Sequence, residues 1–143
     1  ATTPSGNDIT ANIERVDDAT FSKMGTGMTE SSGIFTFPST GLYLVELSAT
    51  IYIPSGNDGS AGVEVHVSSD SGSSFDPTCI AQGGNDAGGQ GYVTACNRTF
   101  VNVTNTSTFQ LKFKATSMSN ASVEGDTGTS YTMFTFIRLG DSQ

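Results

Sequence analysis

The class of fold is decided by the stretch Tyr43-Leu44-Val45-Glu46-Leu47-Ser48-Ala49-Thr50-Ile51-Tyr52-Ile53. Side chains of an extended chain point alternately to its two faces, so every second residue shares a face. The odd-numbered residues of this stretch are all apolar or aromatic, and several are β-branched, which favours a strand. The stretch therefore predicts a long strand whose odd-numbered face, beginning at Tyr43, packs on a core.

Shorter segments with the same alternation lie before and after residues 43–53, and they are bounded by Gly, Asn, Asp, Ser and Pro. We expect strands over residues 9–16, 20–24, 33–38, 63–67, 78–82, 91–95, 99–103, 109–115 and 130–139. One helical turn at most is expected, over residues 17–23. About nine or ten short antiparallel strands predict an all-β sandwich, wound as a jelly roll.

Length and charge limit the organisation and the partners. The 143 residues fit one domain, 1–143, in which we expect residues 1–8 to be a loose N-terminal segment. The formal net charge is −8, and the six Lys and Arg residues do not cluster, which excludes a nucleic-acid partner. Membrane insertion is not expected, because no apolar run approaches the roughly 18 residues that a spanning helix needs.

The last predicted strand is apolar on both of its faces. Tyr131, Met133, Thr135, Ile137 and Leu139 share one face, and Phe134 and Phe136 share the other. One interpretation is a strand covered on both sides within its own domain. The interpretation we favour is that one face packs on the core and the other packs on a neighbouring subunit.

Two segments carry a resemblance to a known family. Residues 33–45 run Gly-Ile-Phe-Thr-Phe-Pro-Ser-Thr-Gly-Leu-Tyr-Leu-Val and resemble the G-x-F-x-x-P-x-x-G-x-Y-x-F stretch of the C1q/TNF-like jelly roll. Residues 130–137 run Ser-Tyr-Thr-Met-Phe-Thr-Phe-Ile and resemble the aromatic closing strand of that family. The resemblance covers roughly residues 9–140. The Gly-, Ser-, Thr- and Asn-rich, Lys-poor composition resembles C1q-like modules of viral and bacteriophage structural proteins.

The resemblance implies a homotrimer with the closing strand near the threefold axis. The trimer interface would include Tyr131, Met133, Phe134, Phe136 and Tyr43. The implied role is a non-catalytic protein of the virion surface that decorates a capsid or tips a fibre. Its partners would be further copies of itself, a capsid or fibre protein, and a host-surface receptor or glycan.

Two alternatives remain open at this point. One is a secreted, extracellular C1q-like recognition module that binds a protein or a glycan. The other is a carbohydrate-binding appendage of an enzyme, which the absence of Trp disfavours, although exposed Tyr residues offer similar aromatic faces. Glycosylation and binding to capsids or to sugars would separate these alternatives from the virion role.

Catalysis is not expected from the residues present. His66 is the only histidine, and it lies in the alternating run Val63-Glu64-Val65-His66-Val67, on the face opposite to the valines. We expect it to face solvent or an interface, because a histidine in this setting is seldom catalytic. The adjacent carboxyl groups of Asp17 and Asp18 point apart on an extended chain, so they do not suit paired acid–base chemistry.

The two cysteines lie symmetrically about a Gly-rich loop. If residues 78–82 and 92–97 form a hairpin centred near residues 87–88, Cys79 and Cys96 face each other. We expect a disulfide, which would indicate an oxidising compartment. The alternative is a pair of reduced, buried thiols.

The tripeptide Gly-Asn-Asp occurs three times, at residues 6–8, 56–58 and 84–86. The second and third occurrences mark two candidate ligand-facing loops. Their residues are Asn57 and Asp58 in the first loop, and Asn85 and Asp86 in the second. Rigid sandwiches commonly present recognition loops, and we expect them within residues 55–62, 83–90 and 117–129. No metal site or cofactor is predicted; Asp58 and Asp86 are weak Ca²⁺ candidates, since Asn and Asp also simply form turns.

Overall fold

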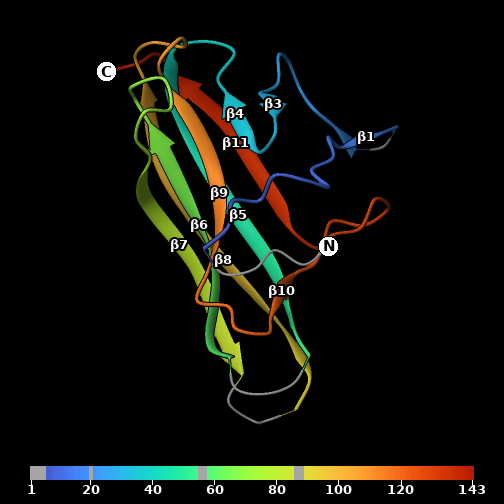
Figure 1. Cartoon of the computed structure of the whole chain (residues 1–143). Helices are drawn as coiled ribbons and strands as arrows, with labels where there is room; N and C mark the ends of the chain where they lie inside the picture. The colour runs from blue at the N-terminus through green and yellow to red at the C-terminus, as the bar shows by residue number, and fades with distance from the viewer. Residues whose placement is uncertain (1–5, 20, 55–57, 86–88) are drawn as a thin grey trace.

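The computed structural model describes residues 6–19, 21–54, 58–85 and 89–143. Two β-sheets pack face to face into an elongated sandwich (Figure 1). No described segment forms a helix long and apolar enough to cross a bilayer. The strands are β1 (Asp17–Asp18), β2 (Phe21–Ser22), β3 (Thr29–Ser31), β4 (Ile34–Thr36), β5 (Gly41–Ile53), β6 (Asp58–Ser68), β7 (Asp76–Asn85), β8 (Gly91–Val103), β9 (Gln110–Thr116), β10 (Ser122–Val123) and β11 (Met133–Gly140).

The four-stranded sheet is built around β5. Strand β8 pairs with β5 along its whole length, from Gly41 opposite Val103 to Ile53 opposite Gly91. Strands β10 and β11 pair with the other edge of β5, and all three pairings are antiparallel. The odd-numbered residues of β5 are buried, so the long core strand predicted from the alternation is confirmed.

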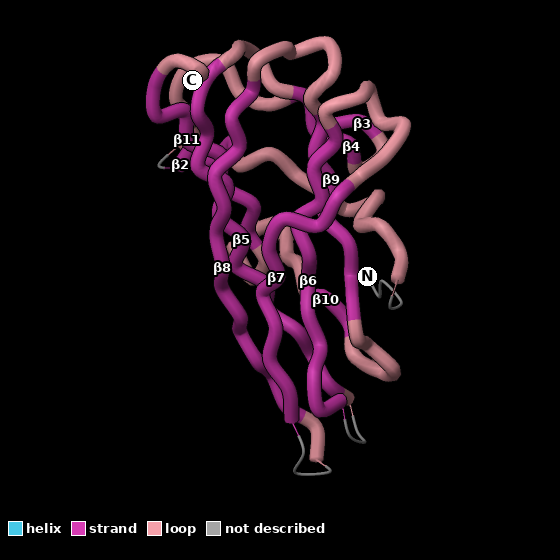
Figure 2. Tube along the Cα trace, turned by 90° about the vertical axis from the view of Figure 1, so that its left-hand side faces the viewer, coloured by secondary structure: helices cyan, strands magenta, loops and turns pink. Residues whose placement is uncertain are grey.

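The five-stranded sheet has the strand order β3-β4-β9-β6-β7. Its last strand, β7, lies beside β8, which is an edge strand of the other sheet (Figure 2). The side-chain amide of Asn97 on β8 donates a hydrogen bond of 2.6 Å to the carbonyl oxygen of Ile80 on β7. This contact ties the edges of the two sheets together.

The core between the sheets contains a cluster of four phenylalanine rings. Phe35 and Phe113 come from the five-stranded sheet, and Phe134 and Phe136 come from β11 of the other sheet. Full burial of one such side chain contributes about 1.5–3 kcal/mol to folding. The cluster therefore holds the closing strand against the opposite sheet.

The chain passes repeatedly from one sheet to the other. It leaves the five-stranded sheet after β4, returns at β6, crosses again between β7 and β8, and comes back at β9 before ending on β11. Strands that are consecutive in the chain therefore often lie in different layers. This winding is that of a jelly roll, and the predicted all-β antiparallel sandwich is confirmed.

Several predicted elements differ from the observed ones. Residues 9–16 form no named strand, because the chain turns at Asn12, whose φ is 59°. The segment 17–23 holds the short pair β1–β2 in place of a helical turn. Residues 91–95 and 99–103 belong to one continuous strand, β8, and both β3 and β10 were absent from the prediction.

The N-terminal segment that was predicted to be loose is bonded in its described part. The backbone N–H of Gly6 donates to the carbonyl of Ala115 at 2.8 Å, and the carbonyl of Asn7 accepts from the N–H of Ala115 at 3.0 Å. The Asp8 carboxylate pairs with the Lys112 ammonium group at 2.9 Å. Residues 6–8 thus extend the edge of β9 beyond the end of β4.

The turn between β3 and β4 explains why a glycine stands at position 33. Gly33 has a φ of 82°, and a Cβ atom there would lie 2.4 Å from the carbonyl oxygen of Ile9. Its N–H donates to the Glu30 carboxylate at 2.7 Å. The turn therefore requires both the left-handed backbone and the close approach that only glycine permits.

Candidate interaction surface

The outer face of the four-stranded sheet carries an apolar row that runs across three strands. Leu44 on β5 is the Cα partner of Phe100 on β8 and of Ile137 on β11. Phe100 is 64% exposed and Ile137 is 43% exposed, while Leu44 between them is half-buried. We call these three residues the apolar row. Leu139, which follows Ile137 by two residues on β11, is also exposed, so the apolar area continues beyond the row.

A polar belt crosses the middle of the same face. Glu46 and Arg98 face each other on β5 and β8, with 3.8 Å between the carboxylate and the guanidinium group. In the next pair of positions the Cys96 thiol donates to the hydroxyl of Ser48 at 3.4 Å. A shallow cavity of about 420 Å³ lies among these residues and is bordered by Met133. The belt is solvated, so its ion pair contributes little to stability.

Two tyrosines occupy the far end of the face. Tyr52 and Tyr92 are Cα partners, and their ring centroids lie 5.0 Å apart with an angle of 37° between the ring planes. Tyr92 is 68% exposed. The hydroxyls of Thr50 and Thr94, in the adjacent pair of positions, lie 3.2 Å apart. Hydroxyl groups therefore separate the tyrosines from the polar belt.

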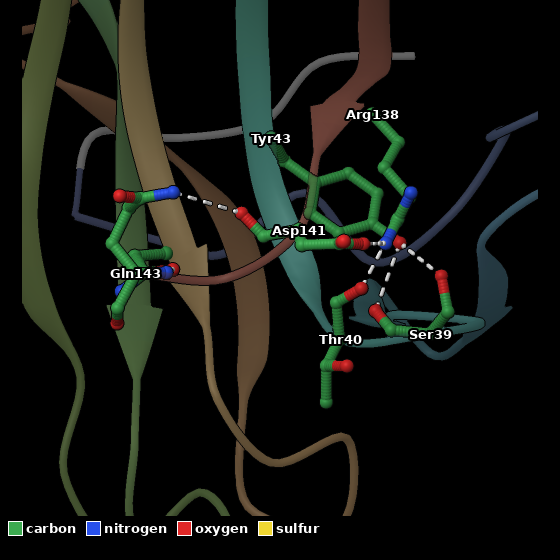
Figure 3. Close-up of polar contacts among 7 residues, drawn as sticks. Ser39, Thr40, Tyr43, Arg138, Asp141 and Gln143 are labelled. Atoms are coloured by element: carbon green, nitrogen blue, oxygen red, sulfur yellow. Dashed lines mark hydrogen bonds and ion pairs between the residues drawn. The ribbon is translucent and has the colours of Figure 1, made fainter.

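The end of the face near the C-terminus is fixed by a set of polar contacts (Figure 3). Arg138 donates from Nε to the carbonyl of Thr40 at 2.9 Å and pairs with Asp141 at 2.8 Å. The backbone N–H of Gln143 donates to the side-chain oxygen of Asn102 at 3.0 Å. These contacts hold the chain after β11 against the neighbouring strands, beside the apolar row.

The residues predicted for a trimer interface divide between the surface and the core. Tyr131 and Met133 are 48% and 37% exposed, so both are available to a partner. Phe134 and Phe136 pack against the buried core, as their place on the opposite face of the strand requires. Tyr43 is only 3% exposed, with its hydroxyl bonded to Ser39, so its predicted interface position needs correction.

The predicted hairpin between the cysteines is wrong. Cys79 lies on β7, opposite Val65 of β6, whereas Cys96 lies on β8, opposite Ser48 of β5. The two strands belong to different sheets, and both thiols are free. Burial raises the pKa of the Cys79 thiol, which favours its neutral form.

The loops predicted to face a ligand start from one end of the sandwich. Asp58 and Asn85 are Cα partners at the ends of β6 and β7, so the described residues of the two Gly-Asn-Asp segments lie side by side. Asn57 and Asp86 lie outside the described residues. Among the described residues, no cluster of three or more metal-ligating side chains occurs. The Asn85 amide donates to the carbonyl of Gly89 at 3.0 Å, a contact typical of turn chemistry.

His66 is buried within the domain, which corrects the expectation that its side chain faces solvent or an interface. It is 8% exposed, and its Nε2 lies 2.7 Å from the Glu64 carboxylate. On the adjacent strand β9 its Cα partner is Lys112, which pairs with Asp8 and lies over the ring of Phe75. Lys112 and its partner Asp8 are both more than forty residues from His66 in the chain, whereas Phe75 belongs to the turn that follows β6.

The sequence interpretation missed Leu44, Phe100, Tyr52 and Tyr92 as surface residues. Leu44 and Tyr52 interrupt the alternation of β5, because they are apolar residues at its even-numbered, outward positions. That irregularity is a signal that the sequence alone contains. The pairing of Leu44 with Phe100 depends on the register of β5 and β8, which no local pattern specifies.

Comparisons by sequence alone give no relatives. No protein-family model matches the chain, and a search of characterised proteins found no match. Solved structures do match. Murine APRIL at pH 5.0 superposes with a TM-score of 0.62 at 14% identity, covering 81% of this chain and 80% of that chain.

A second match supports the same architecture. Eiger TNF from S. frugiperda gives a TM-score of 0.61 at 12% identity, covering 81% of this chain and 71% of that chain. The fold is a TNF-like jelly roll. The resemblance inferred from residues 33–45 and 130–137 is confirmed at the level of the fold. At these identities the likeness concerns the TNF-like fold and not the activity of the chain.

Proposed function

We propose that this TNF-like jelly roll is a non-catalytic protein that works as a homotrimer, assembled through the outer face of its four-stranded sheet. The observation that carries the proposal is the apolar row of Leu44, Phe100 and Ile137, continued by Leu139. Apolar side chains gathered on one face of a soluble domain favour contact with another protein surface. Met133, the first residue of β11, and Tyr131, which precedes that strand, are also exposed and add apolar surface next to the polar belt.

The resemblance to C1q/TNF-like domains supports a threefold arrangement around the closing strand β11. A second copy is the fitting occupant of the face, because the apolar row lies on three rigid, paired strands and the polar belt lies beside it. The pair Glu46–Arg98 gives each copy one charge of either sign at the belt. Charges of this kind favour one relative orientation of the copies over others.

The assembled protein would sit on the outside of a virion, as a capsid decoration or a fibre tip, and bind a host-surface receptor or glycan. The composition that resembles virion modules supports this location. The three groups of candidate loops, which start from the end of the sandwich away from the apolar row, support recognition at that end. A secreted, extracellular recognition module with the same assembly is the alternative.

Non-catalytic action is supported by the placement of the reactive groups. His66 is buried against Glu64, and the Cys79 side chain packs against the core. In the described part of the chain, the histidine is hydrogen-bonded to Glu64 and the Cys96 thiol is hydrogen-bonded to Ser48, so neither thiol is paired with the histidine. Among the described residues, a thiol nucleophile activated by the histidine is therefore not assembled.

The assembly is tested by light scattering after size exclusion. We expect the purified chain to have three times the mass of one protomer at micromolar concentration. Phe100→Glu and Ile137→Glu, which each add a charge to the apolar row, should give the mass of a monomer. Met24→Glu is the control, because Met24 is 97% exposed and lies outside the four strands of this sheet.

A monomeric wild-type chain would overturn the assembly proposal, as would a trimer that tolerates both charged substitutions. The virion location has its own test, which is mass spectrometry of purified virus particles from the source culture. Finding the chain among the particle proteins is expected. Finding it only in the particle-free supernatant would favour the secreted module.

A further inference from the structure

Tyr52 and Tyr92 form an aromatic platform at the end of the sandwich where the candidate loops begin. Their rings lie 5.0 Å apart, tilted by 37°, and Tyr92 exposes 68% of its surface. We propose that this platform binds an uncharged pyranose unit of a glycan. The inference rests on the proposed function, since it names the ligand class and the residues for recognition at that end.

The chemistry of a sugar face matches that of the two rings. The face of an aromatic ring carries negative charge density, and the C–H groups on one side of a pyranose are weakly positive, so they attract each other. Tyrosine also provides this area with only two side-chain torsions to immobilise. Both rings stand on long paired strands, so little further ordering is needed on binding.

Polar groups that suit sugar hydroxyls surround the platform. The Tyr52 hydroxyl donates to the side-chain oxygen of Gln90 at 3.4 Å, and the amide of Gln90 also carries N–H donors. Gln90 is exposed, and so is Thr94, whose hydroxyl lies in the adjacent cross-strand pair. An apolar surface with a few hydrogen-bonding groups at its border is the usual design of a small-ligand site.

The charge around the platform favours a neutral ligand. Ser122, the Cα partner of Tyr52 on β10, is uncharged. The cross-strand pairs Ile53–Gly91 and Thr50–Thr94, on either side of the tyrosine pair, are uncharged as well. The chain as a whole carries a net charge of −8, which repels acidic sugars such as sialic acids. A neutral hexose or pentose therefore fits better than a charged saccharide.

The platform is far enough from the apolar row to remain open when that row is covered. Leu44 and Tyr52 are eight residues apart on β5, which corresponds to about 26 Å along an extended strand. The polar belt and the hydroxyls of Thr50 and Thr94 lie between them. Assembly and glycan binding can thus be measured separately on the same protein.

The test uses saturation-transfer NMR on the full chain with four neutral hexasaccharides: cellohexaose, maltohexaose, laminarihexaose and xylohexaose. We expect transfer to at least one of them and none to sialyllactose, the charged probe. Tyr92→Ala should weaken binding at least about tenfold, because the stacking face is lost. Tyr92→Phe keeps that face and should bind within about threefold of the wild type.

Light scattering on the same samples distinguishes this proposal from the proposed assembly. Tyr92→Ala should leave the mass unchanged, whereas Phe100→Glu should change the mass. The glycan proposal is overturned by the absence of transfer to every neutral hexasaccharide, by equal binding of Tyr92→Ala, or by a lower mass of Tyr92→Ala that places the rings between subunits. Stronger transfer to sialyllactose than to the neutral sugars would also overturn it. A monomeric wild type that still binds a hexasaccharide would refute the assembly alone.

Discussion

The rings of Phe113 and Phe134 stack in parallel, with 3.5 Å between their centroids and 6° between their planes. Phe113 comes from β9 of the five-stranded sheet, and Phe134 is the second residue of β11 in the other sheet. The contact therefore joins the two layers at the strand that closes the fold. Phe35 meets both rings edge-on and completes the packing around them.

Truncation of this stack should destabilise the protein strongly. Phe113 is fully buried, so Phe113→Ala removes its contacts and leaves a cavity, and we expect a loss of about 3–5 kcal/mol in the free energy of unfolding. Urea denaturation followed by circular dichroism measures the loss. Met24→Ala, at a 97% exposed position, should change the free energy by less than about 0.5 kcal/mol. Similar losses in the two variants would contradict the described core.

Asp70 should make stability depend on pH in the acid range. Its carboxylate accepts from the backbone N–H of Ser74 at 2.9 Å and from the hydroxyls of Ser74 and Ser68, each at 2.7 Å. These bonds, the first of them most strongly, lower the pKa of Asp70 from 3.8 to about 2. The unfolded chain thus takes up this proton at a higher pH than the folded chain, so the stabilisation is complete above about pH 4 and is lost towards pH 2.

The measurement for Asp70 is a series of urea midpoints across that pH range. Near neutral pH, the urea midpoint of the wild type should be higher than that of Asp70→Asn. The difference between the two midpoints should shrink as the pH falls from about 4 to about 2. Asp17→Asn, at an exposed position on β1, gives the effect of removing one charge in general. A difference that stays constant down to pH 2 would mean that the carboxylate is not held by these donors.

Both cysteines should react with a thiol reagent without added reductant. We expect two thiols per unfolded chain with a thiol reagent in denaturant, because Cys79 and Cys96 are both free. In Cys96→Ser, alkylation of the remaining thiol should still be rising above pH 9, since burial raises the pKa of Cys79 above its ordinary value of 9.0. Absence of thiols before reduction would restore the predicted disulfide.

Gly33 should not tolerate a side chain. A Cβ atom there meets the carbonyl of Ile9, and the positive φ is itself unfavourable for alanine, so Gly33→Ala should cost about 1–3 kcal/mol. Gly125 is the matched control, because nothing lies within 4 Å of a Cβ built on it and its φ is not in the left-handed range. Gly125→Ala should be neutral or slightly stabilising, and thermal unfolding of the two variants makes the comparison.

The parts of the fold that local pattern specifies were predictable. The alternation of residues 43–53 placed Tyr43 on the core face, and this agrees with its burial. The resemblance placed the same residue at an interface, and there the local pattern was the better guide. The division of the last strand also followed from alternation, since Phe134 and Phe136 point inward while Met133 and Ile137 are exposed.

The parts that depend on distant partners were not predictable from local pattern. The symmetry of residues 78–82 and 92–97 suggested a hairpin, but β7 pairs with β6, and β8 pairs with β5, in different layers. His66 is covered because the N-terminal segment holds Lys112 beside it, a contact across more than one hundred residues. Such contacts are set by the winding of the chain, which a single sequence does not display.

Strand β11 pairs with β5, although about ninety residues of chain separate Leu47 from its partner Phe134. During synthesis, β5 therefore leaves the ribosome long before β11, one of the three strands that pair with it, exists. The inner rings of Phe35 and Phe113 stay uncovered until the final strand emerges and closes over them. Completion of this domain is thus a late event in translation, and a nascent chain stalled before residue 133 would present that hydrophobic surface to chaperones.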